Sequence, residues 1–167
     1  MNNVQLLELL EQTEAQLPDL MKDPARWQSM LVNYEKPNVY RLWAQLGENR
    51  VYLHKIMPCA RGETLYHPHP WPSAVRIVNG RYEMGVGFGP TPPPEAALMV
   101  LEAGSVYAMA HPQAWHYVRP LDKPSFSVMV TAKPHLMPVD DYENDIPPQR
   151  PLTAEEAQHH LKAFRML

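Results

Sequence analysis

The chain has 167 residues, of which 45% are hydrophobic and 20% charged, and its formal net charge is −3. This size and balance predict one globular domain over residues 1–167 and exclude a strongly basic surface of the kind that binds nucleic acid. The single cysteine, Cys59, excludes an internal disulfide, and no apolar run approaches the ~20 residues that cross a membrane, so we expect a cytoplasmic protein with no membrane partner.

Two helices are predicted at the N-terminus, within residues 4–32. Leucines at helical spacing predict the first over residues 4–17, and Pro18 is expected to end it. Asp23-Pro24 is typical of an N-cap followed by the first helical position, and this predicts a second helix through about Val32.

From residue 39 the pattern changes to the alternation typical of strands. The runs 39–46 and 51–57 are predicted to form a hairpin through residues 47–50, and Asn79-Gly80 is a tight-turn signal between two later runs. Further strands are predicted at 64–67, 73–78, 81–87, 97–101, 105–109, 115–119 and 125–132. Many short strands at regular spacing predict an all-β fold, either a sandwich or a closed barrel.

The last part of the chain, residues 133–167, is predicted to be a proline-rich strap followed by one helix. Thr153 and Glu156 have the spacing of a capping box, so the helix is expected to start there and to end at about Met166.

Two histidines stand two residues apart in the run from Gly62 to Trp71: His67 and His69. On an extended segment their side chains point the same way, and two imidazoles on one face can bind a metal. His116, in a later strand pattern, is a third histidine that could join them. Eight histidines make such a pair common by chance, and the nearby prolines also fit a stiff loop, so the pair alone leaves both interpretations open.

Two stretches resemble the motifs of the cupin superfamily. Gly62–Gly80, with His-x-His on a strand and a following strand that ends in a glycine turn, resembles the first motif. Leu101–Met109, together with the later His116, resembles the second. The resemblance implies a jelly-roll barrel over about residues 39–132, flanked by the two N-terminal helices and the C-terminal helix. In cupins the two motifs lie on facing strands and share one metal ion.

Carried over to this sequence, the metal ligands are His67, His69 and His116. The first motif usually adds a glutamate four or five residues after the second histidine, where this chain has Ser73 and Ala74. Three neutral imidazoles, as in the three-histidine cupin dioxygenases, suit one divalent transition metal. Iron(II) is the expected ion, and nickel or zinc also fits.

His111 is the alternative to His116 as third ligand, but His111-Pro112 is typical of a turn, whereas the segment around His116 is typical of a strand. His54 is a candidate proton-transfer group, and Arg76 a candidate for binding a substrate carboxylate. A core histidine and a solvated arginine are the alternatives. The remaining candidates for the pocket are Trp71, Ser73, Trp115 and Glu83, the last as a replacement ligand.

The resemblance implies a metal-dependent oxidoreductase, a non-haem iron dioxygenase-like enzyme that acts on a small organic acid or related metabolite, and we expect this substrate to be anionic. The alternative is a non-catalytic cupin that binds a small molecule, with or without metal. We also expect a homodimer, in which the stripe formed by Leu6, Leu10 and Leu17 packs on the barrel or across the interface.

Overall fold

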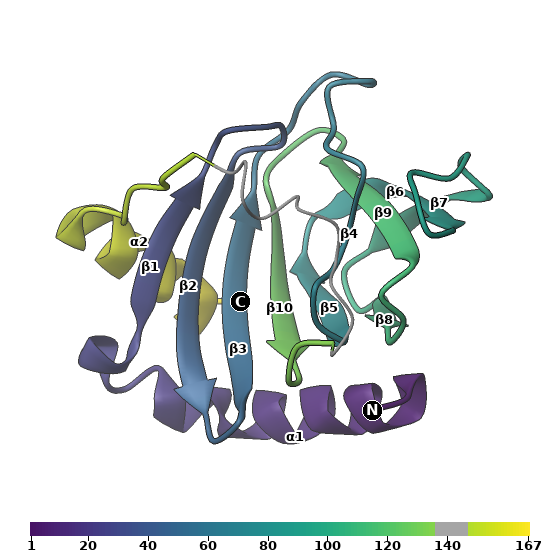
Figure 1. Cartoon of the computed structure of the whole chain (residues 1–167). Coiled ribbons are helices and arrows are strands. Elements are labelled where there is room, and N and C mark those ends of the chain that lie inside the picture. The colour runs from purple at the N-terminus through teal and green to yellow at the C-terminus, as the bar shows by residue number, and fades with distance from the viewer. Residues whose placement is uncertain (136–146) are drawn as a thin grey trace.

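Figure 1 shows the computed structural model, which describes residues 1–135 and 147–167. Within these residues a helix stands near each end of the chain, with ten strands between them. The helices are α1 (Asn3–Leu20) and α2 (Ala154–Arg165), and a short 3₁₀ turn, η1, covers Pro24–Arg26. The strands are β1 (Gln28–Val32), β2 (Val39–Leu46), β3 (Asn49–Ile56), β4 (His67–Pro68), β5 (Ser73–Asn79), β6 (Arg81–Phe88), β7 (Ala97–Glu102), β8 (Val106–Met109), β9 (Ala114–Pro120) and β10 (Ser125–Thr131).

The strands form two antiparallel sheets. The larger sheet has the order β1-β2-β3-β10-β5-β8, and the smaller has the order β4-β9-β6-β7. This confirms the predicted mostly-β fold and gives it the form of a two-sheet sandwich. The closed barrel that we expected is not formed among the described strands, because the two sheets do not join through continuous pairing.

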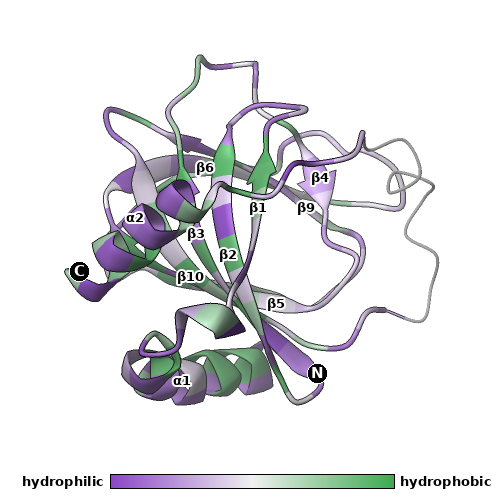
Figure 2. Ribbon diagram, turned by 90° about the vertical axis from the view of Figure 1, so that its left-hand side faces the viewer, coloured by the Kyte–Doolittle hydropathy of each residue, from purple (hydrophilic) through white to green (hydrophobic). Residues whose placement is uncertain are grey.

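The larger sheet buries both of its faces. In β3, Val51 and Leu53 lie in the main hydrophobic cluster with the leucines of α1, whereas Tyr52 packs in a separate cluster on the opposite face. Helix α1 crosses β10, β5 and β8, and α2 lies against β2 (Figures 1 and 2). The side chains of β3 therefore alternate between the helix layer and the space between the two sheets.

Helix α1 is longer than the sequence predicts. Its N-cap is Asn2, which forms a capping box with Gln5, and the helix continues past Pro18 to Leu20. A proline in the last turn removes only one backbone hydrogen bond, and burial of Leu20 on the sheet offsets that loss. The stripe formed by Leu6, Leu10 and Leu17 is buried on the sheet of its own chain.

The predicted second N-terminal helix is absent from residues 23–32, and this prediction was wrong. Asp23 does cap a turn, because its Oδ1 accepts a hydrogen bond from the backbone N–H of Ala25, but the turn ends at Arg26. The following residues pair with β2 as strand β1, with Leu31 opposite Tyr40. Edge pairing with a long neighbouring strand stabilises an extended conformation that the local capping signal does not reveal.

Two local signals are confirmed. Gly80 has φ +81°, which lets Asn79-Gly80 turn tightly between β5 and β6. Thr153 and Glu156 form the predicted capping box at the start of α2. Residues 136–146, which belong to the predicted strap, lie outside the described residues.

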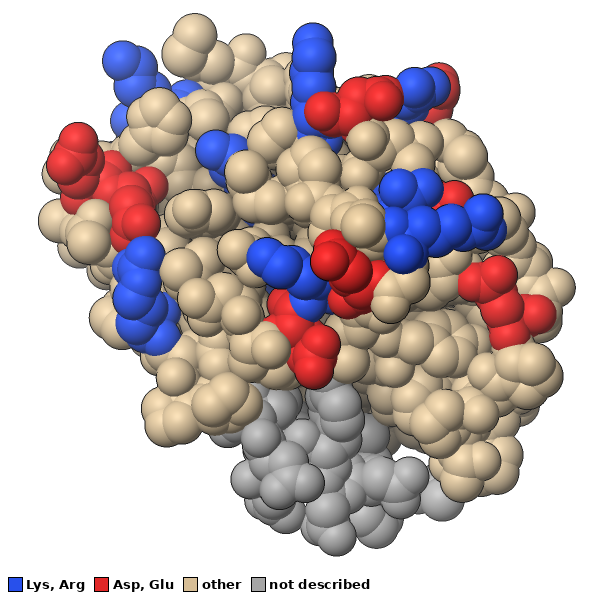
Figure 3. Space-filling view, turned by 90° about the horizontal axis from the view of Figure 1, so that it is seen from above, with Lys and Arg blue, Asp and Glu red and all other residues tan. Residues whose placement is uncertain are grey.

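The described helices are too short or too polar to cross a membrane. On the face shown in Figure 3, basic and acidic side chains lie close together without forming a block of one sign.

Candidate metal centre

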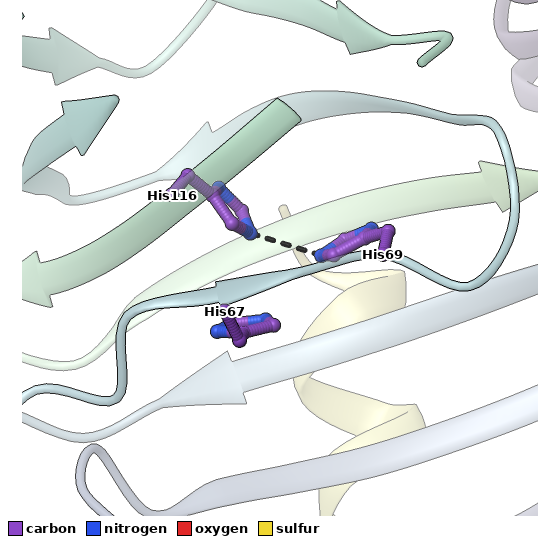
Figure 4. Close-up of side chains that lie close together, drawn as sticks. All are labelled: His67, His69 and His116. Atoms are coloured by element: carbon purple, nitrogen blue, oxygen red, sulfur yellow. Dashed lines mark hydrogen bonds between the residues drawn. The ribbon is translucent and has the colours of Figure 1, made fainter. Parts of the chain in front are cut away.

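Strand pairing brings the predicted histidines together. His67 on β4 lies directly opposite His116 on β9, and Pro68 lies opposite Trp115. Opposite residues of an antiparallel pair point to the same face, so the imidazoles of His67 and His116 lie side by side. His69 follows two residues later, and its ring joins them from the segment after β4 (Figure 4).

The three rings are in close contact. Their ring centroids are 5.3 Å apart for His67 and His69, 4.9 Å for His67 and His116, and 4.7 Å for His69 and His116. One nitrogen from each ring can be chosen so that all three lie within 4.8 Å of one another. A metal bonded at ~2.1 Å holds two nitrogens no farther apart than about 4.2 Å, so small side-chain rotations suffice to coordinate one ion.

Hydrogen bonds orient two of the rings. Nδ1 of His67 lies 3.1 Å from the carbonyl oxygen of Leu65, which can only accept, so Nδ1 carries the proton and Nε2 keeps a lone pair. Nδ1 of His69 lies 3.0 Å from Oγ of Ser73. Outer partners of this kind fix the ring orientation of metal-ligating histidines, so Ser73 has a defined place beside His69.

His116 provides the test of whether the cluster fits a metal. Its side chain is buried, its Nδ1 has no hydrogen-bond partner, and its Nε2 faces Nε2 of His69 at 2.9 Å. Burial lowers the pKa of His67 and, more strongly, those of His69 and His116, so the rings are neutral near pH 7. The Nε2 atoms of His69 and His116 share one proton in this hydrogen bond, and a divalent transition metal in its place would accept the lone pairs of both neutral rings.

The histidines border a cavity of about 100 Å³ between the two sheets. Its wall is mostly apolar, with a few polar groups from both sheets. The lining residues are Val39, Arg41, His54, Ile56, His67, His69, Val75, Tyr107, His116, Val118, Ser127 and Met129. A small, largely apolar cavity with a few convergent polar groups has the character of a binding site for a small molecule.

Arg41 and His54 form the polar part of the opposite wall. They are cross-strand neighbours in β2 and β3, and Nε of Arg41 donates a hydrogen bond of 3.0 Å to Nε2 of His54. His54 is buried, and both its burial and the charge of Arg41 lower its pKa well below the ordinary value. His54 therefore lies on the cavity side of the larger sheet. Arg41 is a wall residue that our sequence analysis missed.

Arg76 is not brought into the cavity. Its Nε donates to Oε1 of Glu14 in α1 at 2.7 Å, so its side chain lies on the helix side of the larger sheet. The arginine that lines the cavity is Arg41, from a different strand.

Glu83 and Trp115 also face away from the cavity. Glu83 accepts hydrogen bonds from Arg119 and from the hydroxyl of Tyr117, on the outer face of the smaller sheet. Trp115 packs beside Tyr66 and donates from Nε1 to the carbonyl oxygen of Gly89. Both residues alternate with inward ones, Met84 and His116, as strand parity requires.

Trp71 and His111 also lie away from the cavity wall. Trp71 does not contribute to the cavity wall, although it follows His69 closely in the chain. His111 is exposed, and its Nδ1 accepts a hydrogen bond from the backbone N–H of Gln113, so it is held in a turn away from the cluster.

The sequence matches no family model, and no curated protein is significantly similar to it. Solved structures do match. Hydroxypropylphosphonic acid epoxidase from S. wedmorenis superposes with a TM-score of 0.52 at 10% identity, over 65% of this chain and 56% of that one. A structure of Fe(II) HppE superposes with a TM-score of 0.54 at 8% identity, over 65% of this chain and 58% of that one.

The chain has the cupin fold. At these identities the likeness concerns the fold alone, and the chain spans little more than half the length of these structures. The cupin fold agrees with the two-sheet sandwich and explains why β4 and β9 face the cavity together. A weaker likeness, with a TM-score of 0.48 at 15% identity, extends over 65% of this chain and 88% of KdgF from Halomonas sp..

Proposed function

We propose that this protein is a metal-dependent oxidoreductase, with dioxygenase-like activity on a small organic acid. His67, His69 and His116 would hold one divalent transition metal, which we propose to be iron(II). The observation that carries the proposal is the convergence of three neutral imidazoles on one side of a small cavity that also contains a guanidinium.

Two further observations support a metal-dependent reaction. The cavity wall offers nitrogen ligands and no thiolate, and three imidazoles leave open coordination positions on the ion. HppE, which shares this fold, has been solved with Fe(II) and with Co(II). When bound, iron(II) would supply Lewis acidity and a redox centre.

The chain's own residues would do the remaining work. The apolar wall excludes water from the site, which strengthens electrostatic interactions there. Arg41 would bind and orient an acidic substrate. His54 would hold a proton at Nδ1, because its Nε2 is occupied as the acceptor for Arg41.

The proposal predicts activity that depends on iron and on a carboxylate. Metal-free protein loaded with iron(II) should consume dioxygen when incubated with a panel of small organic acids, measured with an oxygen electrode. The matched amides should be at least 10-fold poorer, because they lack the charge that the site would neutralise. The zinc-loaded protein is the control, since zinc has no redox chemistry.

A different outcome would favour the alternative function. Tight binding of a small acid without consumption of dioxygen, by protein that carries its full complement of iron, would indicate a non-catalytic binding protein. Absence of both binding and turnover would contradict the proposal altogether.

We also propose that the protein forms a homodimer, although the stripe formed by Leu6, Leu10 and Leu17 cannot supply the interface, because it is buried within one chain. Exposed apolar side chains remain on β6, β7 and β8, among them Phe88, Leu98 and Val100. Light scattering at micromolar concentration should give about twice the chain mass of 19.2 kDa. A mass of a single chain would contradict the dimer.

A further inference from the structure

Arg41 is a cation at the cavity wall without an acidic partner in the described part of the chain. Its contacts there are the hydrogen bond to His54 and a cation–π contact, with its guanidinium carbon 5.4 Å from the centre of the Tyr52 ring. Arg76, on the opposite face of the same sheet, does have such a partner, because its Nε lies 2.7 Å from Oε1 of Glu14. A partly buried guanidinium without a carboxylate partner favours the binding of an anion that can enter the cavity and pair with it.

The cavity wall supplies no negative charge to balance it. None of the lining residues is Asp or Glu. Tyr107 stays neutral, because burial raises its pKa to about 12. Arg41 also acts on the cluster, since its charge contributes to the lowered pKa values of His67 and His69. A divalent ion on three neutral histidines would therefore share the cavity with a second, separate positive charge.

The hydrogen bond to His54 determines how Arg41 can bind an anion. A guanidinium pairs with a carboxylate through two parallel N–H groups, either side-on through Nε or end-on through the two terminal nitrogens. His54 occupies Nε–H, so the end-on pair is the one left for a ligand. His54 thus acts as a positioning residue for Arg41.

We propose that the ligand of this cavity is a small dianion with two acidic groups, one bound at the three-histidine cluster and the other paired end-on with Arg41. A dicarboxylate fits best, because two carboxylates match the two separate positive centres. Binding of the first acidic group, at the metal, rests on the proposed function. Binding of the second acidic group, the Arg41 anchor, depends on Arg41 alone. A cavity of about 100 Å³ restricts the ligand to a few carbon atoms.

The test is calorimetric titration of malonate, its half-amide malonamate and the neutral malonamide into zinc-loaded and metal-free protein. Zinc-loaded wild type should bind malonate roughly 10- to 100-fold more tightly than malonamate, since a hydrogen-bonded charge pair is lost in the amide. Arg41→Gln should reduce that preference to about threefold or less. Arg41→Lys keeps the positive charge but cannot form two parallel hydrogen bonds to a carboxylate, so it should retain only part of the preference for malonate.

Arg50→Gln is the matched control, because Arg50 is an exposed arginine of the same hairpin, stacked on Trp43 outside the cavity. It should leave the preference unchanged. For His54, the measured quantity is the ratio of the affinity for malonate to the affinity for malonamate. His54→Leu should lower this ratio. His54→Gln restores an acceptor for Nε of Arg41 and should recover it.

The metal-free titrations separate the two proposals. If the protein does not bind zinc but its weaker preference for malonate still disappears in Arg41→Gln, the metal proposal fails and the Arg41 anchor stands. An equal preference in wild type and Arg41→Gln would overturn the Arg41 anchor. Absence of malonate binding to either form of folded wild type would overturn it as well.

Discussion

Replacing His116 by alanine is expected to abolish stoichiometric metal binding. His116 lies opposite His67 and directs its Nε2 toward His69, so its removal leaves two ligands and an opening in the buried side of the cluster. Loss of an outer hydrogen-bond partner already costs metal sites roughly 10- to 100-fold in affinity, and loss of a ligand should cost more. Elemental analysis after dialysis should give about one equivalent for wild type and little for His116→Ala.

His111→Ala is the matched control, because His111 was the alternative third ligand but lies exposed in a turn. It should keep the wild-type metal content. Full occupancy in His116→Ala, or loss of metal in His111→Ala, would show that the ligand assignment is wrong.

The metal-free protein is expected to lose stability steeply as the pH falls below about 6.5. Burial lowers the pKa values of His54, His69 and His116 well below the ordinary value and that of His160 to about 4. In each case the unfolded chain binds more protons than the folded one between the two pKa values. Stability is therefore fully present above pH 6.5 and falls as the pH drops toward the folded-state pKa.

His160 gives this prediction its magnitude. It is buried in α2, where its Nε2 donates to the carbonyl oxygen of Leu53, and a pKa of about 4 against 6.5 corresponds to about 3 kcal/mol lost by pH 4. Urea unfolding at pH 7.5, 6.0 and 5.0 measures the loss. His160→Gln keeps a donor for Leu53 but cannot titrate, so its unfolding free energy should fall less over this range.

Parallel pH profiles for wild type and His160→Gln would contradict the assignment of that part of the acid sensitivity to His160. The metal-loaded wild type should also resist acid better than the metal-free protein down to the pH at which protons displace the metal, because binding stabilises only the folded state.

Signals that act over a few residues predicted the structure well. Alternating apolar residues located β2, β3 and β5 to β10 to within about two residues, and the capping box at Thr153 located the start of α2. The predicted strand 64–67 overlaps β4 only at His67. Signals that depend on distant partners failed. Asp23-Pro24 caps only a short turn because the next residues pair with β2, and Pro18 does not end α1 because Leu20 packs on the sheet.

The candidate site shows the same division. The spacing of His67 and His69 was enough to place both rings on one side, and the strand around His116 was enough to prefer it to His111. Arg76 was misplaced because a cation in an apolar run does not reveal which face of the sheet is covered by a helix.

Arg41 was missed because the predicted hairpin turn, residues 47–50, is two residues longer than the observed one. That turn would place Arg41 opposite Ile56. In the structure Leu46 pairs with Asn49, which places Arg41 opposite His54. The hydrogen bond between the two residues follows directly from that register.

X-ray absorption spectroscopy of the metal-loaded protein tests the central claim most directly, because it reports the ligands of the ion itself. Iron(II)- or zinc-loaded wild type should show scattering from three imidazoles at one ion per chain, and His67→Ala, His69→Ala and His116→Ala should each lose that signature. A metal surrounded by oxygen ligands with fewer than three imidazoles, in protein that is folded and fully loaded, would contradict a metal centre at His67, His69 and His116.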